Sequence, residues 1–317
     1  MDELIKSLKA EPALAWKLAV NAQGHAAGSS AAKKAAQAVK ESELVRGLLK
    51  ERLPNGRTRH KAYSKWTGAH WILSLLADLG YPPGDKSIRP MMEQTFDSWL
   101  SEGHKEHIRL IAGRMRRCAS QEGNTVWSSL RLGFSDGRTT ELVERLIAWQ
   151  WPDGGWNCDK RPEAGKSSFM ESLIPLRALA LYASASNDRR AWLAAERAAD
   201  IFLKRELFKR QSTGAVMDPH FLKLHYPCYW HYDILFGLKV MAEAGLIGDP
   251  RCKPALDLLE SKRLPDGGFP AEETYSRLIR PELSNYSLVN WGGINTRRMN
   301  PFVTADALYV LRASGRA

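Results

Sequence analysis

The segment "AWQWPDGGWNCD" at residues 148–159 combines tryptophans with two adjacent glycines and a proline, and "SKRLPDGGFPAE" at residues 261–272 nearly repeats it. Glycine lets a chain turn sharply, and proline stiffens the turn. A turn built twice from the same residues indicates that the surrounding unit is also repeated. The chain is therefore expected to be a repeat protein.

Glycine turns recur along the sequence, ending at Gly56, Gly103, Gly154, Gly214 and Gly267. Amphipathic helices are predicted before them, at 32–52, 89–100, 139–150, 189–207 and 252–263. More apolar helices are predicted after them, at 65–80, 124–134, 167–183, 229–245 and 301–313, and strand patterns are nearly absent. The pattern predicts an all-α ring of five to six helix pairs over 31–317, preceded by a helical segment at 1–30.

The stretch "LIAWQWPDGGW" (146–156) resembles the QW repeat of terpenoid cyclases and protein prenyltransferase β subunits, with Gln150, Gly154 and Trp156 in the motif positions. The second copy has Arg263, Gly267 and Phe269 there. The resemblance implies an (α/α) toroid with inner and outer helix rings around a cavity. The sequence departs from the family in having no DxDD and no DDxxD, which puts ordinary protonation-initiated cyclisation in doubt.

Composition restricts the class of protein and its partners. The chain has 46 Lys and Arg and 35 Asp and Glu, so its net charge is +11. Such a charge suits a partner with a diphosphate or an acidic membrane surface. The alternative is that the basic residues lie on solvated helix faces. No pattern specific for nucleic-acid binding is found. The sequence has no apolar run of 18 residues and no signal sequence, and its four cysteines are widely spaced. These features predict a cytoplasmic protein without a transmembrane segment.

The densest group of reactive side chains is "FLKLHYPCYWHYDILFG" (221–237). Pro227 is expected to open a helix, which would place His231 and Asp233 within its first two turns as an acid–base pair, with His225 nearby. The alternative is a helix start with hydrogen-bonded histidines and aromatic packing. Glu171, Asp159 and Asp306, at or near the starts of other inner helices, are candidate auxiliary carboxylates.

Aromatic side chains near the starts of the inner helices are candidate walls of a substrate cavity, because aromatic rings bind apolar ligands and stabilise cations. They are Trp66, Trp127, Tyr226, Tyr229, Trp230 and Trp291, with His70 four residues after Trp66 and expected on the same helix face. The alternative is a plain aromatic core. Arg297 and Arg298 are candidates to hold a diphosphate.

The sequence predicts no cofactor, and a zinc site is the weighed alternative. Cys118, Cys158, Cys228 and His231 are its candidate ligands, although no paired CxxC motif supports them. Together the patterns predict an enzyme that acts on a hydrophobic, isoprenoid-like substrate in a central cavity. The alternatives are a toroid that acts on a polyanionic sugar, as lyases do, and a non-catalytic scaffold whose ring is filled.

Overall fold

The computed structural model describes residues 2–22, 24, 26, 28–278 and 285–316, and 53% of the chain is helical. The helices of the first half are α1 (Asp2–Leu8), α2 (Pro12–Lys17), η1 (Leu18–Ala22), α3 (Ser30–Lys40), α4 (Glu43–Leu49), α5 (Ala69–Leu79), η2 (Lys86–Ile88), α6 (Arg89–Leu100), α7 (Glu102–Lys105), α8 (Ala119–Arg131) and α9 (Gly137–Trp149). Those of the second half are α10 (Phe169–Ser186), α11 (Arg189–Leu203), η3 (Pro219–Leu222), α12 (Ile234–Glu243), η4 (Pro250–Cys252), α13 (Lys253–Ser261) and α14 (Pro301–Ala313). The prediction of a mostly helical protein is confirmed.

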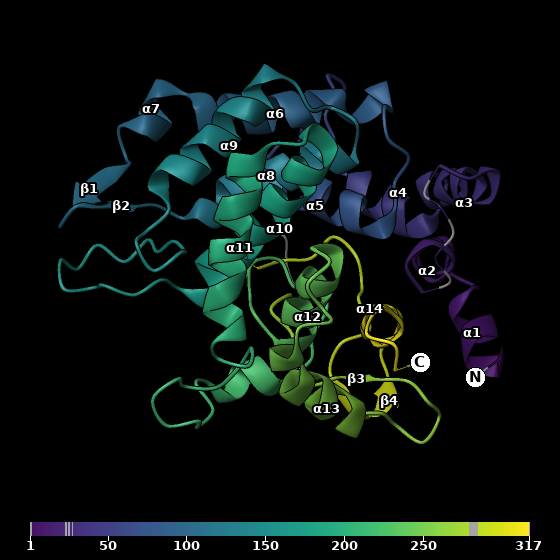
Figure 1. The fold of residues 1–317 in the computed structure, drawn as a ribbon. Coiled ribbons are helices and arrows are strands. Elements are labelled where there is room, and N and C mark those ends of the chain that lie inside the picture. Colours follow the sequence, from purple (N-terminus) through teal and green to yellow (C-terminus); the bar gives the residue numbers. More distant parts are fainter. Residues whose placement is uncertain (1, 23, 25, 27, 279–284, 317) are drawn as a thin grey trace.

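Two small antiparallel sheets interrupt the helices (Figure 1). Strand β1 (Arg109–Ile111) pairs with β2 (Arg114–Arg116), and β3 (Pro270–Ala271) pairs with β4 (Asn295–Met299). Neither was predicted, because strands this short carry little period-two signal.

Six helices form the buried centre of the molecule, and we call α2, α5, α8, α10, α12 and α14 the central helices. Contacts link α5 to α8, α8 to α10, α10 to α12, α12 to α14, α14 to α2 and α2 back to α5, so that the circuit closes. The other long helices lie outside it: α3 against α2, α6 against α5, α9 against α8, α11 against α10 and α13 against α12. Each of these amphipathic helices thus packs against one of the central helices.

The repeated turn forms the same hydrogen bonds in three places. Trp151 N–H donates to the carbonyl of Gly155, and Gly154 N–H donates to the carbonyl of Trp151. The equivalent pairs recur in the turns at 264–268 and 53–57. Gly154 is required, because its φ is 102° and an added Cβ would lie 2.4 Å from the carbonyl oxygen of Arg197.

Three local predictions were wrong. Gly103 lies inside the short helix α7 and not in a turn. The predicted helix 32–52 is broken before Glu43, because the Ser42 hydroxyl accepts from Val45 N–H and starts a new helix. Residues 229–233 are not helical, because the Asp233 carboxylate caps the Phe236 N–H, so that α12 begins at Ile234.

Candidate functional site

The central helices α5, α8, α10, α12 and α14 run in the same direction. Two interior chambers are lined by these helices. In α8, α10, α12 and α14 the side chains at the second chamber come later in the chain than those at the first or are shared with it, and in α5 Ala77 and Asp78 of the second follow Ser74 and Leu75 of the first. Asn124 and Arg131 of α8 illustrate this order. The helix N-termini therefore gather at one end, which we call the starting end, and their dipoles make it favourable for anions.

Two thiols and a carboxylate converge at the starting end. Cys118 is the N-cap residue of α8, Cys158 follows the QW-like turn, and Glu171 lies in the first turn of α10. One donor atom from each lies within 4.8 Å of the others, and Cys158 Sγ is 3.8 Å from Oε1 of Glu171. The other oxygen of Glu171 accepts a 3.1 Å hydrogen bond from Ser120 N–H. We call Cys118, Cys158 and Glu171 the thiol–carboxylate cluster.

The cluster holds three acidic groups in a partly buried place. The hydrogen bond with Cys158, burial and the charge of Glu171 raise the pKa of Cys118, while the same hydrogen bond lowers the pKa of Cys158. Burial raises the pKa of Glu171, against the lowering effect of its hydrogen bond from Ser120. A divalent cation bound by these donors would relieve the cost of ionising them together.

A short hairpin brings the cluster together. The backbone N–H of Arg117 donates to the carbonyl of Asn157 at 3.3 Å, and Arg116 pairs with Asn157 in an isolated bridge. The Arg116 guanidinium donates to the carbonyl of Ala164 at 2.7 Å. These bonds fix strand β2, and with it Cys118, against the loop that carries Cys158.

Polar side chains missed by the sequence analysis surround the cluster. Glu122 is fully buried, with Oε1 3.0 Å from His104 Nε2 and 3.5 Å from Arg117 Nε. Its Oε2 has no hydrogen-bond partner among the described residues. Arg117 also donates to Gln121. Its charge opposes the effect of burial on the pKa of Glu171, which is nevertheless raised overall. The available signal was the run "RRCASQEGN", which places Glu122 one helical turn after Cys118.

The predicted pairing of His231 with Asp233 is wrong, because the carboxylate of Asp233 faces His225. His225 Nδ1 lies 2.8 Å from Asp233 Oδ2, and both side chains are completely buried. Burial alone would lower the pKa of His225, but the charge and hydrogen bond of Asp233 outweigh it and raise the pKa. His225 Nε2 has no partner among the described residues. Asp233 thus has two structural roles, as helix cap and as partner of His225.

His231 lies in an aromatic stack. Its ring is 3.4 Å from that of Tyr275, nearly parallel, and 4.5 Å from that of Trp230. Burial, His225 and Lys65 lower its pKa to about 3, so His231 is neutral at physiological pH. Trp66 lies before α5, and not on one helix face with His70 as predicted, since α5 begins at Ala69. It stacks on Tyr229 at 3.9 Å.

Ion pairs occupy the middle of the central helices. Lys17 lies 2.6 Å from Asp78 and 2.8 Å from Asp306, and Lys239 lies 2.6 Å from Asp78 and 2.9 Å from Asp306. The Tyr226 hydroxyl donates to Asp78 at 3.0 Å. Burial alone would raise the pKa of Asp78, but the neighbouring cations hold it well below its ordinary value. The chamber between these ion pairs and the starting end has a volume of about 40 Å³.

Lys17, Asp78 and Lys239 were not predicted from the sequence, although lone charges in otherwise apolar helices were a visible signal. Only Asp306 of the network was predicted, as an auxiliary carboxylate. In the structure its two oxygens are both held by lysines, 2.8 Å from Lys17 and 2.9 Å from Lys239.

The remaining predicted residues are not gathered in one place. Asp159 lies beside the cluster in sequence, but its carboxylate pairs with Arg161 on the surface. Cys228 lines the small chamber, apart from the thiol–carboxylate cluster, with Trp127 and Tyr229. Trp291 packs on Tyr226 and Phe302, and His70 is buried with neither ring nitrogen hydrogen-bonded to any of the described residues. Arg297 and Arg298 lie exposed on β4, which is near α13 and α14, away from β2 (Figure 1).

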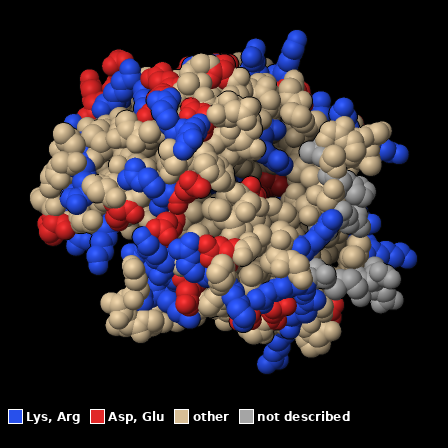
Figure 2. Space-filling view, in the orientation of Figure 1, with Lys and Arg blue, Asp and Glu red and all other residues tan. Residues whose placement is uncertain are grey.

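The surface carries no single basic patch on the face shown in Figure 2, where Lys and Arg are mixed with Asp and Glu. None of the described helices is long and apolar enough to cross a membrane. Comparison with protein-family models, curated proteins and solved structures found no match.

Proposed function

We propose that the chain is an (α/α) toroid, with the central helices as inner ring. The closed circuit of contacts among α2, α5, α8, α10, α12 and α14 supports this arrangement. The common direction of five of these helices supports it too, because each must be followed by an outer helix that runs back. The turn that recurs with the same hydrogen bonds at 53–57, 151–155 and 264–268 is a third support.

We further propose that the chain is a zinc-dependent enzyme whose active centre is the thiol–carboxylate cluster. The observation that carries it is the convergence of Cys118, Cys158 and Glu171 donor atoms within 4.8 Å. Thiolate and carboxylate are zinc ligands, and three protein ligands leave the fourth position open, as at catalytic zinc sites. Cys118 and Cys158 are half-buried, so a substrate can reach this position from solvent.

The substrate of this centre is proposed to be small and polar. The chamber inside the central helices holds about 40 Å³ beside the ion pairs of Asp78 and Asp306, which leaves no room for an isoprenoid chain. Outside it, the partly buried guanidinium of Arg117, which also donates to Gln121, offers hydrogen bonds next to the cluster. A zinc ion there would act as a Lewis acid, which suits hydrolysis or group transfer.

Metal content tests the centre directly. Protein purified without chelators is expected to carry one zinc per chain by elemental analysis, and the cobalt-substituted protein should show thiolate-to-cobalt absorption. Cys118→Ser, Cys158→Ser and Glu171→Gln should lower metal retention. Cys252→Ser is the matched control, because Cys252 is buried against the carbonyl of Leu246, outside the cluster. Equal zinc in Cys118→Ser and the unmodified protein, or none in either, would exclude the centre.

Activity is tested separately from metal binding. The zinc-loaded protein is incubated with a mixture of small esters, thioesters, phosphoesters and thiols, and consumption is followed by mass spectrometry. Turnover by the unmodified protein and its loss in Cys158→Ser are the expected results. Zinc binding without turnover of any compound would favour a structural zinc centre. The protein would then be the non-catalytic scaffold considered above, because the middle of the central helices is filled by side chains.

A further inference from the structure

A second chamber lies beyond the central ion pairs, at the end of the molecule where the central helices finish. Its volume is about 220 Å³, and its lining comes from α2, η1, α5, α8, α10, α12 and α14. It shares Asp78, Trp127 and Arg177 with the small chamber. The thiol–carboxylate cluster is at the starting end, so the second chamber is a separate place.

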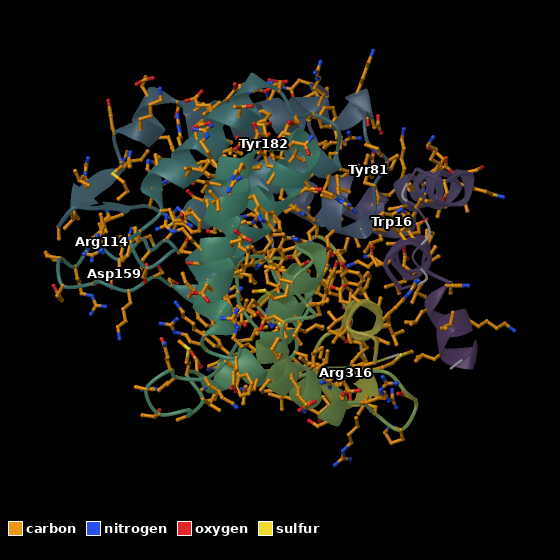
Figure 3. All side chains as sticks on the ribbon, viewed as in Figure 1. Trp16, Tyr81, Arg114, Asp159, Tyr182 and Arg316 are labelled. Atoms are coloured by element: carbon orange, nitrogen blue, oxygen red, sulfur yellow. The ribbon has the colours of Figure 1, made fainter. Side chains whose placement is uncertain are left out.

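An apolar groove continues this chamber toward the surface. The groove has a volume of about 550 Å³ and lies between α3 and the end of α5, where Ala36, Tyr81 and Pro82 form part of its wall. Trp16, Ala77 and Arg131 line both the groove and the chamber. Arg131 therefore stands at the junction of a polar inner space and an apolar outer one. Trp16 and Tyr81 lie on the side of the molecule away from Asp159 (Figure 3).

The charges around the chamber do not balance. Its cations and those of the adjoining ion pairs are Lys17, Arg131, Arg177 and Lys239, and its carboxylates are Asp78, Glu243 and Asp306. Arg177 binds Glu243 at 2.5 Å and Asp78 at 3.3 Å, and both lysines bind two carboxylates each. Arg131 has no carboxylate within 4.0 Å among the described residues. Within the described part of the chain, one positive charge, on Arg131, is therefore left without an ion pair.

The end of α8 does not use the donors of Arg131 either. The last carbonyls of the helix are bonded by the loop that follows: Leu132 N–H donates to Ser128, Gly133 N–H to Leu130 and Phe134 N–H to Ser129. No hydrogen bond of the Arg131 guanidinium is found among the described residues, and the Trp16 ring lies 5.6 Å from it. Burial lowers the pKa of Arg131, as expected for a cation without a close partner.

We propose that the second chamber and its groove bind an amphipathic monocarboxylate, with the carboxylate on Arg131 and the apolar body along the groove. A guanidinium pairs with a carboxylate through two parallel hydrogen bonds, which suits a half-buried arginine with free donors. A monoanion neutralises the single excess charge. A dianion such as a phosphate ester would be repelled by Glu243 and Asp78, which line the same chamber.

Calorimetry with decanoate tests the site on the full chain. We expect saturable binding of one decanoate, with decan-1-ol and decylammonium at least about tenfold weaker, because they lack the charge-assisted pair. Arg131→Gln should weaken decanoate binding by about tenfold or more, and Arg131→Lys, which keeps the charge without the planar fork, by less. Arg190→Gln, at an exposed arginine of α11, is the matched control and should change nothing.

Three results would overturn the site: no decanoate binding at millimolar concentration, equal binding of decan-1-ol, or undiminished binding by a folded Arg131→Gln. If Arg131→Gln does not fold, as judged by circular dichroism, the comparison of decanoate with decan-1-ol and decylammonium on the unmodified protein still decides. These outcomes are independent of zinc, because metal content is read separately at the other end of the molecule.

Discussion

Lys17 and Asp306 are separated by 289 positions in the sequence, and their side chains meet at 2.8 Å inside the protein. The same lysine bonds Asp78 of α5, so that one ammonium group joins α2, α5 and α14. The chain closes on itself through a buried charge and not only through apolar packing. A buried ion pair carries a large desolvation cost, and it persists only when every partner is in place.

Removal of one partner from this network is expected to destabilise the protein strongly. Lys239→Met leaves Asp78 and Asp306 each with one cation fewer in a buried place, which should lower the free energy of unfolding by about 3–5 kcal/mol. The matched control is Lys253→Met, whose pair with Asp257 lies on the surface and should contribute little to the free energy of unfolding. Urea unfolding measures both, and equal losses would contradict a special role for the buried network.

The repeated turn predicts graded effects of glycine substitution. Gly154→Ala combines a φ of 102° with a Cβ 2.4 Å from a backbone oxygen, so it should cost more than about 2 kcal/mol in unfolding free energy. At Gly214 the φ is 70°, but an added Cβ would meet no other atom. Gly214→Ala therefore measures the backbone strain alone, which should lower the unfolding free energy by about 1 kcal/mol. Gly165→Ala has neither feature and serves as the reference. A loss at Gly154 no larger than at Gly214 would contradict the close approach to Arg197.

The His225–Asp233 pair predicts a pH dependence of stability. Because the folded pKa of His225 lies above its ordinary value of 6.5, its contribution is fully present below pH 6.5 and is lost as the pH rises through the folded pKa. Asp233→Asn still caps α12 but carries no charge, so it should remove this decline. The quantity to measure is the difference in unfolding free energy between the two proteins from pH 5 to 9. A difference that does not change with pH would show that His225 does not titrate against Asp233.

Helix positions were predictable from the sequence where periodicity and an end signal agreed. Residues 301–313 and 89–100 were predicted as helices with the bounds of α14 and α6. The start of α12 was misplaced, because Pro227 and Asp233 both suit a helix start and only the structure shows that the Asp233 side chain caps Phe236. The spacing of apolar residues does not show which of these two residues starts the helix.

The candidate sites were less predictable, since they depend on which distant side chains meet. Cys118, Cys158 and Glu171 each stood out in the sequence, but Cys118 and Cys158 were grouped with Cys228 and His231, which lie elsewhere. The pairing required the bridge between Arg116 and Asn157, for which the sequence has no signal. The lone charges of the central ion pairs were visible in the sequence, but their pairing was not, because a lone lysine in an apolar helix does not indicate which carboxylate it contacts.

The thiol–carboxylate cluster predicts that zinc protects Cys158 from alkylation. With metal bound, Cys158 should react slowly with iodoacetamide, and removal of zinc by a chelator should accelerate it, because the hydrogen bond with Cys118 lowers its pKa and the freed thiol is half-buried and reachable. Cys118 should stay slow in either state, because the same hydrogen bond and burial raise its pKa. Cys252 should stay slow in either state, since burial raises its pKa to about 12. Mass spectrometry of the labelled peptides gives the rate at each cysteine. Glu171→Gln should give intermediate protection, because it weakens the metal without removing a thiol. Acceleration at Cys252 to the same degree would indicate unfolding by the chelator, and an unchanged rate at Cys158 would show that no metal is held there.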